Sequence, residues 1–117
     1  MKETWIAEEL NSLGMSHKIK GHQACRTAVA MILDAGFKPE IRFVYEAAAE
    51  RLKTDSANVE RNIRYAVEKT WETGDWEAID RTFGLTVDRE RGKPTNSEFL
   101  FLIADRVKNR MKQERDA

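Results

Sequence analysis

The sequence predicts an all-α fold of about six helices, and three observations point to it. Apolar residues recur at three- and four-residue spacing along almost the whole chain, as they do on one face of a helix. Only 2 prolines and 6 glycines among 117 residues leave few residues for the turns of a β-sandwich. The length is that of one domain, which buries enough surface to fold without disulfides or a metal ion. We therefore expect a single helical domain over residues 1–117.

The first half of the chain is predicted to contain three helices. The first ends at Gly14 and the second near Gly36, since glycine is the usual residue after a helix C-terminus. Pro39 suits the first turn of the third helix, and the spacing leaves open whether this helix is broken near Val44 or Tyr45. The apolar face of the first helix comprises Trp5, Ile6, Leu10 and Leu13. That of the second comprises Cys25, Val29 and Ile32, and that of the third comprises Ile41, Val44, Ala48 and Leu52.

The second half is predicted to contain three more helices, each preceded by a polar break. N-cap residue types at 54–56 precede a helix over about 56–72 that ends at Gly74. A fifth helix runs between Asp75 and Gly84, and residues 85–94 form the one long loop. The apolar face of the helix over 56–72 comprises Val59, Ile63, Ala66, Val67 and Thr70. That of the fifth helix comprises Trp76, Ile79 and Phe83, and that of the last helix comprises Leu100, Ile103, Val107 and Met111.

The last helix has the clearest start and the least certain end. Thr95 and Glu98 have the spacing of a capping box, in which each side chain accepts from the other residue's backbone N–H. Residues 113–117 are charged, and we expect this tail to fray. The aromatic residues are expected in the core, namely Trp5, Phe43, Trp71, Trp76, Phe83 and Phe99.

The charge balance limits the classes of partner. Basic and acidic residues number 20 each, so the formal net charge is zero, which excludes a uniformly polybasic binder of nucleic acid or membrane. No stretch approaches the roughly 18 apolar residues of a membrane-spanning helix, and the N-terminus lacks the apolar run of a signal peptide. The single cysteine, Cys25, cannot form an internal disulfide, and we interpret it as a small core residue of a cytoplasmic protein.

Two of the predicted helices have the outline of a helix-turn-helix. Residues 44–52 would be the supporting helix and 56–72 the recognition helix, whose outer face carries Ala57, Asn58, Arg61, Arg64, Tyr65 and Glu68. Arginine can bond O6 and N7 of guanine together, and asparagine can do the same for N6 and N7 of adenine. The predicted base-reading residues are therefore Asn58, Arg61, Arg64 and Tyr65. The alternative is a solvated face on which the arginines pair with Glu60 and Glu68.

Basic segments elsewhere offer contacts to phosphate groups. Residues 15–27 hold Lys18 and Lys20 and no acidic residue, and the long loop holds Arg89 and Lys93. The start of the last helix adds the candidate contacts Thr95, Asn96 and Ser97 for a DNA backbone or a protein partner. The alternatives are that this segment only caps the helix and that the charges form an ordinary solvated surface.

Signals of catalysis are weak. The chain lacks a glycine-rich phosphate loop, a cysteine and histidine cluster with metal spacing, and a nucleophile elbow. His17 and His22 flank Gly21 in a predicted loop and do not form a convincing zinc pair. We expect no enzyme activity, cofactor, metal ion or small-molecule substrate.

Several ordered motifs together resemble one family. The most specific is Lys93-Pro94-Thr95-Asn96-Ser97-Glu98-Phe99. The others are Ile19-Lys20-Gly21, Val59-Glu60-Arg61 with Ile63-Arg64, Ala66-Val67-Glu68 leading to Trp71, Phe83-Gly84 with Thr86-Val87, and Ala104-Asp105. From about Leu10 to about Lys112 the chain resembles the C-terminal effector domains of the family of the sporulation initiation regulator, stage zero sporulation protein A.

The resemblance implies a six-helix DNA-binding domain of the winged-helix-like, response-regulator effector type. It also implies recognition of a short box with a TCGAA-like core in the major groove, by a transcription regulator in the bacterial cytoplasm at the nucleoid. Family domains bind head-to-tail on tandem boxes and act through RNA polymerase. Arg61 and Arg64 match the recognition-helix arginines of the family, and Glu60 matches the neighbouring acid.

The chain also departs from the family pattern. The usual receiver domain and its phosphorylated aspartate are absent from this sequence. Ala57 and Asn58 stand where relatives tend to have Ser and Arg, and Tyr65 where they have His, so these positions bear on which box is preferred. The link over 34–39 is shorter than in the family by about a residue or two. The alternative function is a helical module that keeps the fold and binds a protein partner instead.

Overall fold

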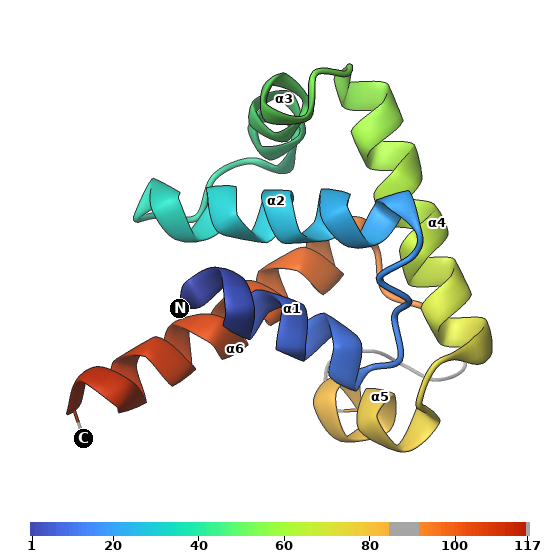
Figure 1. Ribbon diagram of the computed structural model, residues 1–117, viewed down its shortest axis with the longest axis vertical. Helices are drawn as coiled ribbons and strands as arrows, with labels where there is room; N and C mark the ends of the chain where they lie inside the picture. Colours follow the sequence, from blue (N-terminus) through green and yellow to red (C-terminus); the bar gives the residue numbers. More distant parts are fainter. Residues whose placement is uncertain (85–91, 117) are drawn as a thin grey trace.

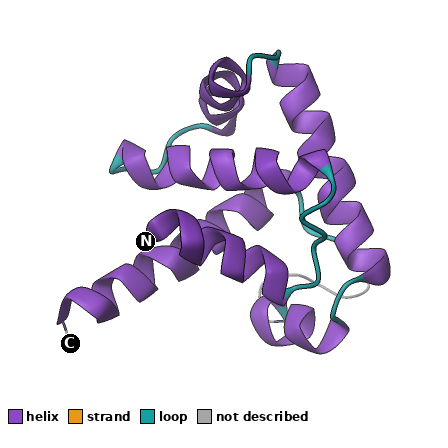
Figure 2. Ribbon diagram, viewed as in Figure 1, coloured by secondary structure: helices purple, strands orange, loops and turns teal. Residues whose placement is uncertain are grey.

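Six helices make up the part of the chain that the structure, a computed structural model, describes, namely residues 1–84 and 92–116. They are α1 (Lys2–Ser12), α2 (Lys20–Ala35), α3 (Ile41–Leu52), α4 (Ser56–Thr73), α5 (Trp76–Phe83) and α6 (Asn96–Asp116). Figure 2 shows helices and loops and no strand over these residues, which confirms the all-α prediction. Most of the predicted long loop, with Thr86, Val87 and Arg89, lies outside the described residues.

The central helix of the fold is α2. It packs against α1, α3, α4 and α6, while α3 also packs on α4, and α6 on α1 and α4. In Figure 1, α4 crosses one end of α2, and the C-terminal ends of α2 and α6 point the other way. The core is mainly apolar, and His22 and Thr70 are its buried polar residues. Its largest fully buried apolar side chains are Phe83, Phe99, Ile6, Leu10, Leu13, Ile63, Leu100, Ile103, Val29, Val59 and Val67.

The crossing of α2 and α4 depends on Gly21. A Cβ atom added at Gly21 would lie 2.3 Å from the backbone oxygen of Asn62 and 2.4 Å from Cβ of Ala66. Any larger residue would therefore push the helices apart, since the neighbouring atom is rigid backbone. This close approach brings the N-terminus of α2 directly beside the middle of α4.

The helix ends follow the predicted polar breaks. Oδ1 of Asp55 accepts from the backbone N–H of Asn58 at 2.8 Å, and Oδ1 of Asp75 accepts from that of Ala78 at 3.2 Å. The capping box of α6 is also confirmed. The Thr95 N–H donates to Oε1 of Glu98 at 2.9 Å, and the Glu98 N–H donates to Oγ1 of Thr95 at 3.1 Å. These side chains satisfy first-turn N–H groups that have no partner within the helix.

Some details of the predicted helices are wrong. Pro39 lies outside α3, because the N-cap residue Glu40 is still extended with ψ of 142°. The question that the spacing left open has a simple answer, since α3 runs unbroken past Val44 and Tyr45. His22 lies in the first turn of α2 and not in a loop. Both errors concern residues close to a helix start, where short-range spacing gives little information.

Two aromatic side chains predicted to be core residues are exposed. Phe43 is 50% exposed on the outer side of α3, where the Arg42 guanidinium lies 4.7 Å from its ring centre, and Trp76 at the start of α5 is 40% exposed. The prediction holds for Phe83 and Phe99, which are buried and stack at 5.6 Å between ring centres. Trp5 and Trp71 are half-buried and pack against the core.

The C-terminal half of α6 extends beyond the core. Val107 is its last buried residue, so Met111, predicted on the buried stripe, is 38% exposed. The helix nevertheless continues through Asp116, whereas the sequence predicts that 113–117 fray. Arg106 and Arg110 form ion pairs with Glu8 and Glu9 of α1, which hold this half of α6 against α1. The residues that follow have high helix propensity, so the helix continues.

Candidate nucleic-acid interface

The two faces of α4 differ as the spacing predicts. Val59, Ile63, Ala66, Val67 and Thr70 are buried against the core. The opposite side, with Ala57, Arg61, Arg64, Tyr65 and Glu68, is exposed, and Tyr65 is 54% exposed. The turn over residues 53–55 joins α3 to α4, so that the two packed helices form a helix-turn-helix.

Asn58 and Arg61 form a network at the start of α4. The side-chain amide of Asn58 donates to Oγ1 of Thr54 at 2.9 Å, and its oxygen accepts from Nη2 of Arg61 at 3.2 Å. Asn58 is half-buried and Arg61 is exposed. Because a guanidinium has five N–H donors, this one bond leaves Arg61 able to donate elsewhere.

Arg64 lies on the flank of α4 nearest to α6. Its guanidinium pairs with the carboxylate of Glu60 one turn earlier, and its side chain remains 47% exposed. This is one of the pairs that the solvated-face alternative predicts. The Arg64 side chain also borders a hollow of about 410 Å³ that is lined by Tyr45, Glu60 and residues 93–97.

Exposed lysines stand on both sides of the outer face of α4. On one side, Lys18 and Lys20 come just before Gly21, which touches α4 at Asn62 and Ala66. On the other side, Nζ of Lys93 lies 3.7 Å from a carboxylate oxygen of Glu68. The face that carries Arg61 and Arg64 is thus framed by two basic segments far apart in the sequence. Arg89 lies outside the described residues.

The start of α6 is tied to the helix-turn-helix. The side-chain amide of Asn96 donates to the Tyr45 hydroxyl at 3.2 Å and to the backbone oxygen of Glu60 at 3.1 Å. The N–H groups of Thr95 and Glu98 are used by the capping box, while Ser97 lines the hollow. The capping interpretation of this segment therefore has direct support, and Asn96 acts inside the protein as well.

Tyr45, which the sequence did not single out, also belongs to this site. Its ring is half-buried and packs against the core, and its hydroxyl reaches the start of α6. Burial raises the pKa of the Tyr45 hydroxyl above its ordinary value, because the charged phenolate is disfavoured away from water. The signal was an aromatic residue with a polar tip at the edge of an apolar stripe, which usually finds a partner when buried.

Under the N-terminus of α2 lies the buried side chain of His22. Nε2 of His22 lies 2.8 Å from Oδ1 of Asn11, and Nδ1 has no hydrogen-bond partner among the described residues. Because the amide oxygen only accepts, Nε2 carries the proton. Burial is the main cause that lowers the pKa of His22, and the charges of Arg26 and His17 add to it.

Residues 1–84 and 92–116 contain neither a membrane-spanning helix nor a cluster of metal-binding side chains. No helix there is long and apolar enough to cross a membrane. No group of three or more histidine, cysteine and acidic side chains there could hold a metal ion.

Comparison with known families agrees with this geometry. A family model described as "Sporulation initiation factor Spo0A C terminal" matches residues 6–107 of the 117-residue chain. The match begins in α1, includes the complete helix-turn-helix, and ends at the last buried residue of α6. The chain therefore belongs to the Spo0A C-terminal family, whose members are all-helical DNA-binding effector domains that regulate transcription in sporulation.

Proposed function

We propose that this protein is a sequence-specific DNA-binding transcription regulator that inserts the N-terminal half of α4 into the major groove. The observation that carries the proposal is the exposed face of α4, where Arg61 and Arg64 stand between the basic segments of Lys18 with Lys20 and of Lys93. The helix is 18 residues, about 27 Å, long, and a helix fits the width of the major groove.

The spacing of the two arginines suits the TCGAA-like box that the family resemblance implies. Three residues along a helix correspond to a rise of about 4.5 Å, close to the roughly 3.4 Å between adjacent base pairs. The central CG step of such a box offers one guanine in each of two adjacent base pairs. In the proposed complex Arg61 and Arg64 each contact one of these guanines, and Asn58 and Tyr65 contact the flanking bases.

Other residues fix the position of the protein on the DNA backbone. Lys18, Lys20 and Lys93 contact phosphates on the two sides of α4, together with Arg89 and the start of α6 at Thr95 and Ser97. Phosphate contacts set the register of the protein on DNA, whereas base contacts give specificity. The regulator acts in the bacterial cytoplasm at the nucleoid, where a second copy on a tandem box and RNA polymerase are its proposed partners.

Fluorescence anisotropy with a box duplex tests the proposal, and a scrambled duplex of equal composition is the control. Loss of one bidentate contact costs about 1–3 kcal/mol, so Arg64→Ala should weaken box binding by about 5- to 150-fold and leave scrambled binding nearly unchanged. Arg115→Ala removes the same charge at the far end of α6 and should bind like the wild type. Equal binding of both duplexes by the wild type would reject sequence-specific recognition of this box. Binding of neither duplex at low salt would favour the protein-interaction module.

A further inference from the structure

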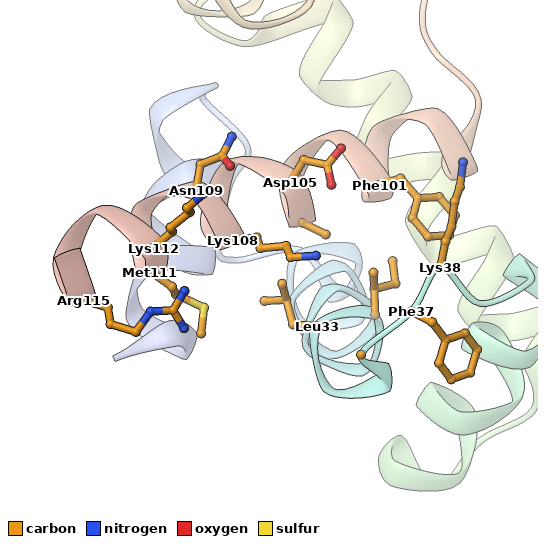
Figure 3. A pocket seen from close by; sticks show the side chains of 13 residues that line it. Leu33, Phe37, Lys38, Phe101, Asp105, Lys108, Asn109, Met111, Lys112 and Arg115 are labelled. Atoms are coloured by element: carbon orange, nitrogen blue, oxygen red, sulfur yellow. The ribbon is translucent and has the colours of Figure 1, made fainter.

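A second surface lies away from α4, between the C-terminal end of α2 and α6. It is a groove of about 580 Å³, shown in Figure 3. Its apolar surface comes from Leu33 of α2, Phe101 and Met111 of α6, and Phe37 in the connection to α3. Phe37 is 72% exposed and Met111 38%, so the groove offers apolar surface that the fold does not bury. Exposed apolar patches with a polar rim mark interaction sites.

The rim of this groove is strongly basic. It carries one acidic side chain, Asp105, and four basic ones, namely Lys38, Lys108, Lys112 and Arg115. None of these four basic side chains forms an ion pair within the described part of the chain. Lys38 instead lies over the ring of Phe101, with Nζ 5.0 Å from its centre.

On the other side of α6, the basic side chains form ion pairs with a neighbouring helix. There Arg106 and Arg110 pair with Glu8 and Glu9 of α1. α1 thus covers one flank of α6 with acidic side chains. On the groove flank, no helix of the described residues places acidic side chains on the basic ones. By charge complementarity, a partner that binds over this flank of α6 would be acidic.

The groove and the proposed DNA-binding face lie at opposite ends of α2. α4 touches α2 at Gly21, and the groove begins at Ile32, which is about 16 Å further along the helix axis. Figure 1 shows α4 at one end of α2 and the chain's C-terminus beyond the other. An occupant of the groove would therefore leave the outer face of α4 accessible.

We propose that this groove binds an acidic amphipathic helix of a protein partner. The walls of the groove are helices, whose backbone groups bond to one another, so the groove offers no strand edge to which an extended peptide could pair. An amphipathic helix that packs its apolar face into the groove fits better. Apolar side chains one turn apart would pack on Phe101, Met111 and Phe37, while flanking carboxylates meet the basic rim. The volume lies within the roughly 300–1,000 Å³ of small-ligand clefts, enough for a few side chains. The apolar surface argues against DNA, whose interfaces are polar.

The test uses a designed peptide as the probe and the 117-residue chain as the binding protein. A fluorescein-labelled amphipathic peptide carries leucines at positions i, i+3, i+4 and i+7, with glutamates on both flanks. A second peptide is identical except that lysines replace the glutamates. Fluorescence anisotropy should show binding of the glutamate peptide, with affinity about tenfold or more above that of the lysine peptide, because like charges at an interface are repelled.

Variants connect the binding to the groove. Lys108→Glu with Lys112→Glu should weaken binding of the glutamate peptide by about fivefold or more through loss of two rim ion pairs. Phe37→Ser removes the exposed ring without touching the core and should also weaken binding. The matched control is Lys69→Glu with Arg81→Glu, which changes the net charge equally on exposed parts of α4 and α5 and should bind the peptide like the wild type. Circular dichroism confirms that each variant is folded.

Four outcomes would overturn the proposal. Equal binding of the two peptides would remove the charge argument, and unchanged binding by the Lys108 and Lys112 variant would place the peptide elsewhere. Self-association of the wild type in sedimentation that the same variant abolishes would identify a second copy as the occupant. Loss of affinity for the box duplex in this variant would make the rim a DNA contact.

Discussion

At the scale of single residues, Asn96 shows how one side chain can have two interpretations. The sequence places it in a segment that could contact DNA, and the structure bonds its amide to Tyr45 and to the backbone of Glu60. The two roles predict different effects of truncating the side chain, one on stability and the other on affinity for DNA. A structural residue changes the free energy of unfolding when it is truncated, whereas a purely DNA-contacting residue changes affinity alone.

Asn96→Ala is therefore expected to lower the free energy of unfolding by about 1 kcal/mol, because two hydrogen bonds are lost in a partly buried place. Urea denaturation followed by circular dichroism measures it. Ser97→Ala is the control, because the Ser97 hydroxyl forms no hydrogen bond to any residue that the structure describes. An Asn96→Ala protein with unchanged stability and weakened DNA binding would make Asn96 primarily a DNA contact.

His22 is the second residue with a measurable consequence. Its pKa is lowered in the folded protein, chiefly by burial, whereas in the unfolded chain it titrates near 6.5. Below that pH the unfolded state binds more protons than the folded state, so the free energy of unfolding falls as the pH is lowered from about 7 to 5.

Denaturation of the wild type and His22→Gln at both ends of this range isolates the contribution. The variant should lose less stability on acidification than the wild type does, whatever its stability at neutral pH. If both lost the same amount, the pH dependence would not come from His22.

At the scale of helices, local chemistry explains the elements and contact between them explains the site. Asp55, Asp75 and the pair of Thr95 and Glu98 act within four residues of themselves, which is why the sequence predicted their helix starts. The crossing of α2 and α4 has no such local signal. It depends on atoms of residues 21, 62 and 66, which meet only after the chain has folded.

Gly21→Ala tests that crossing. Helix propensity alone favours alanine by about 1 kcal/mol, but overpacking against the Asn62 backbone costs about 1–3 kcal/mol, so we expect net destabilisation and weaker DNA binding. Urea denaturation gives the first quantity, and anisotropy with the box duplex the second. Gln23→Ala, at an exposed position of α2, should leave both nearly unchanged. A more stable Gly21→Ala protein would show that the helices can separate at little cost.

At the scale of the molecule, the net charge is zero, although two separate surfaces are rich in basic side chains. One is the outer face of α4 with its flanking lysines, and the other is the groove with its basic rim. Because the total charge is balanced, the salt dependence of DNA binding should report local phosphate contacts and not a general attraction.

With Lys18, Lys20, Arg89 and Lys93 on phosphates, the slope of log affinity against log salt concentration should be about −3.6 and become less steep by about 1 in Lys20→Ala. Anisotropy titrations over a series of salt concentrations measure this slope, and Lys112→Ala in the groove rim should keep the wild-type value. A slope near zero for the wild type would mean that these lysines do not contact phosphates.

The sequence by itself determined the helices, their caps, the buried stripe of α4 and its outward arginines. Each follows from interactions within about one turn, since spacing and capping act between residues only three or four positions apart. Only the tertiary structure decided that Asn96 meets Tyr45 51 residues away, that Phe43 and Met111 stay exposed, and that His22 reaches Asn11. It also brought the segments of Lys18 and Lys93 beside α4 and left a groove with a basic rim at the opposite end of α2. Such arrangements arise because each helix must bury one face against the others, and the packing of all six fixes which remaining faces meet the solvent.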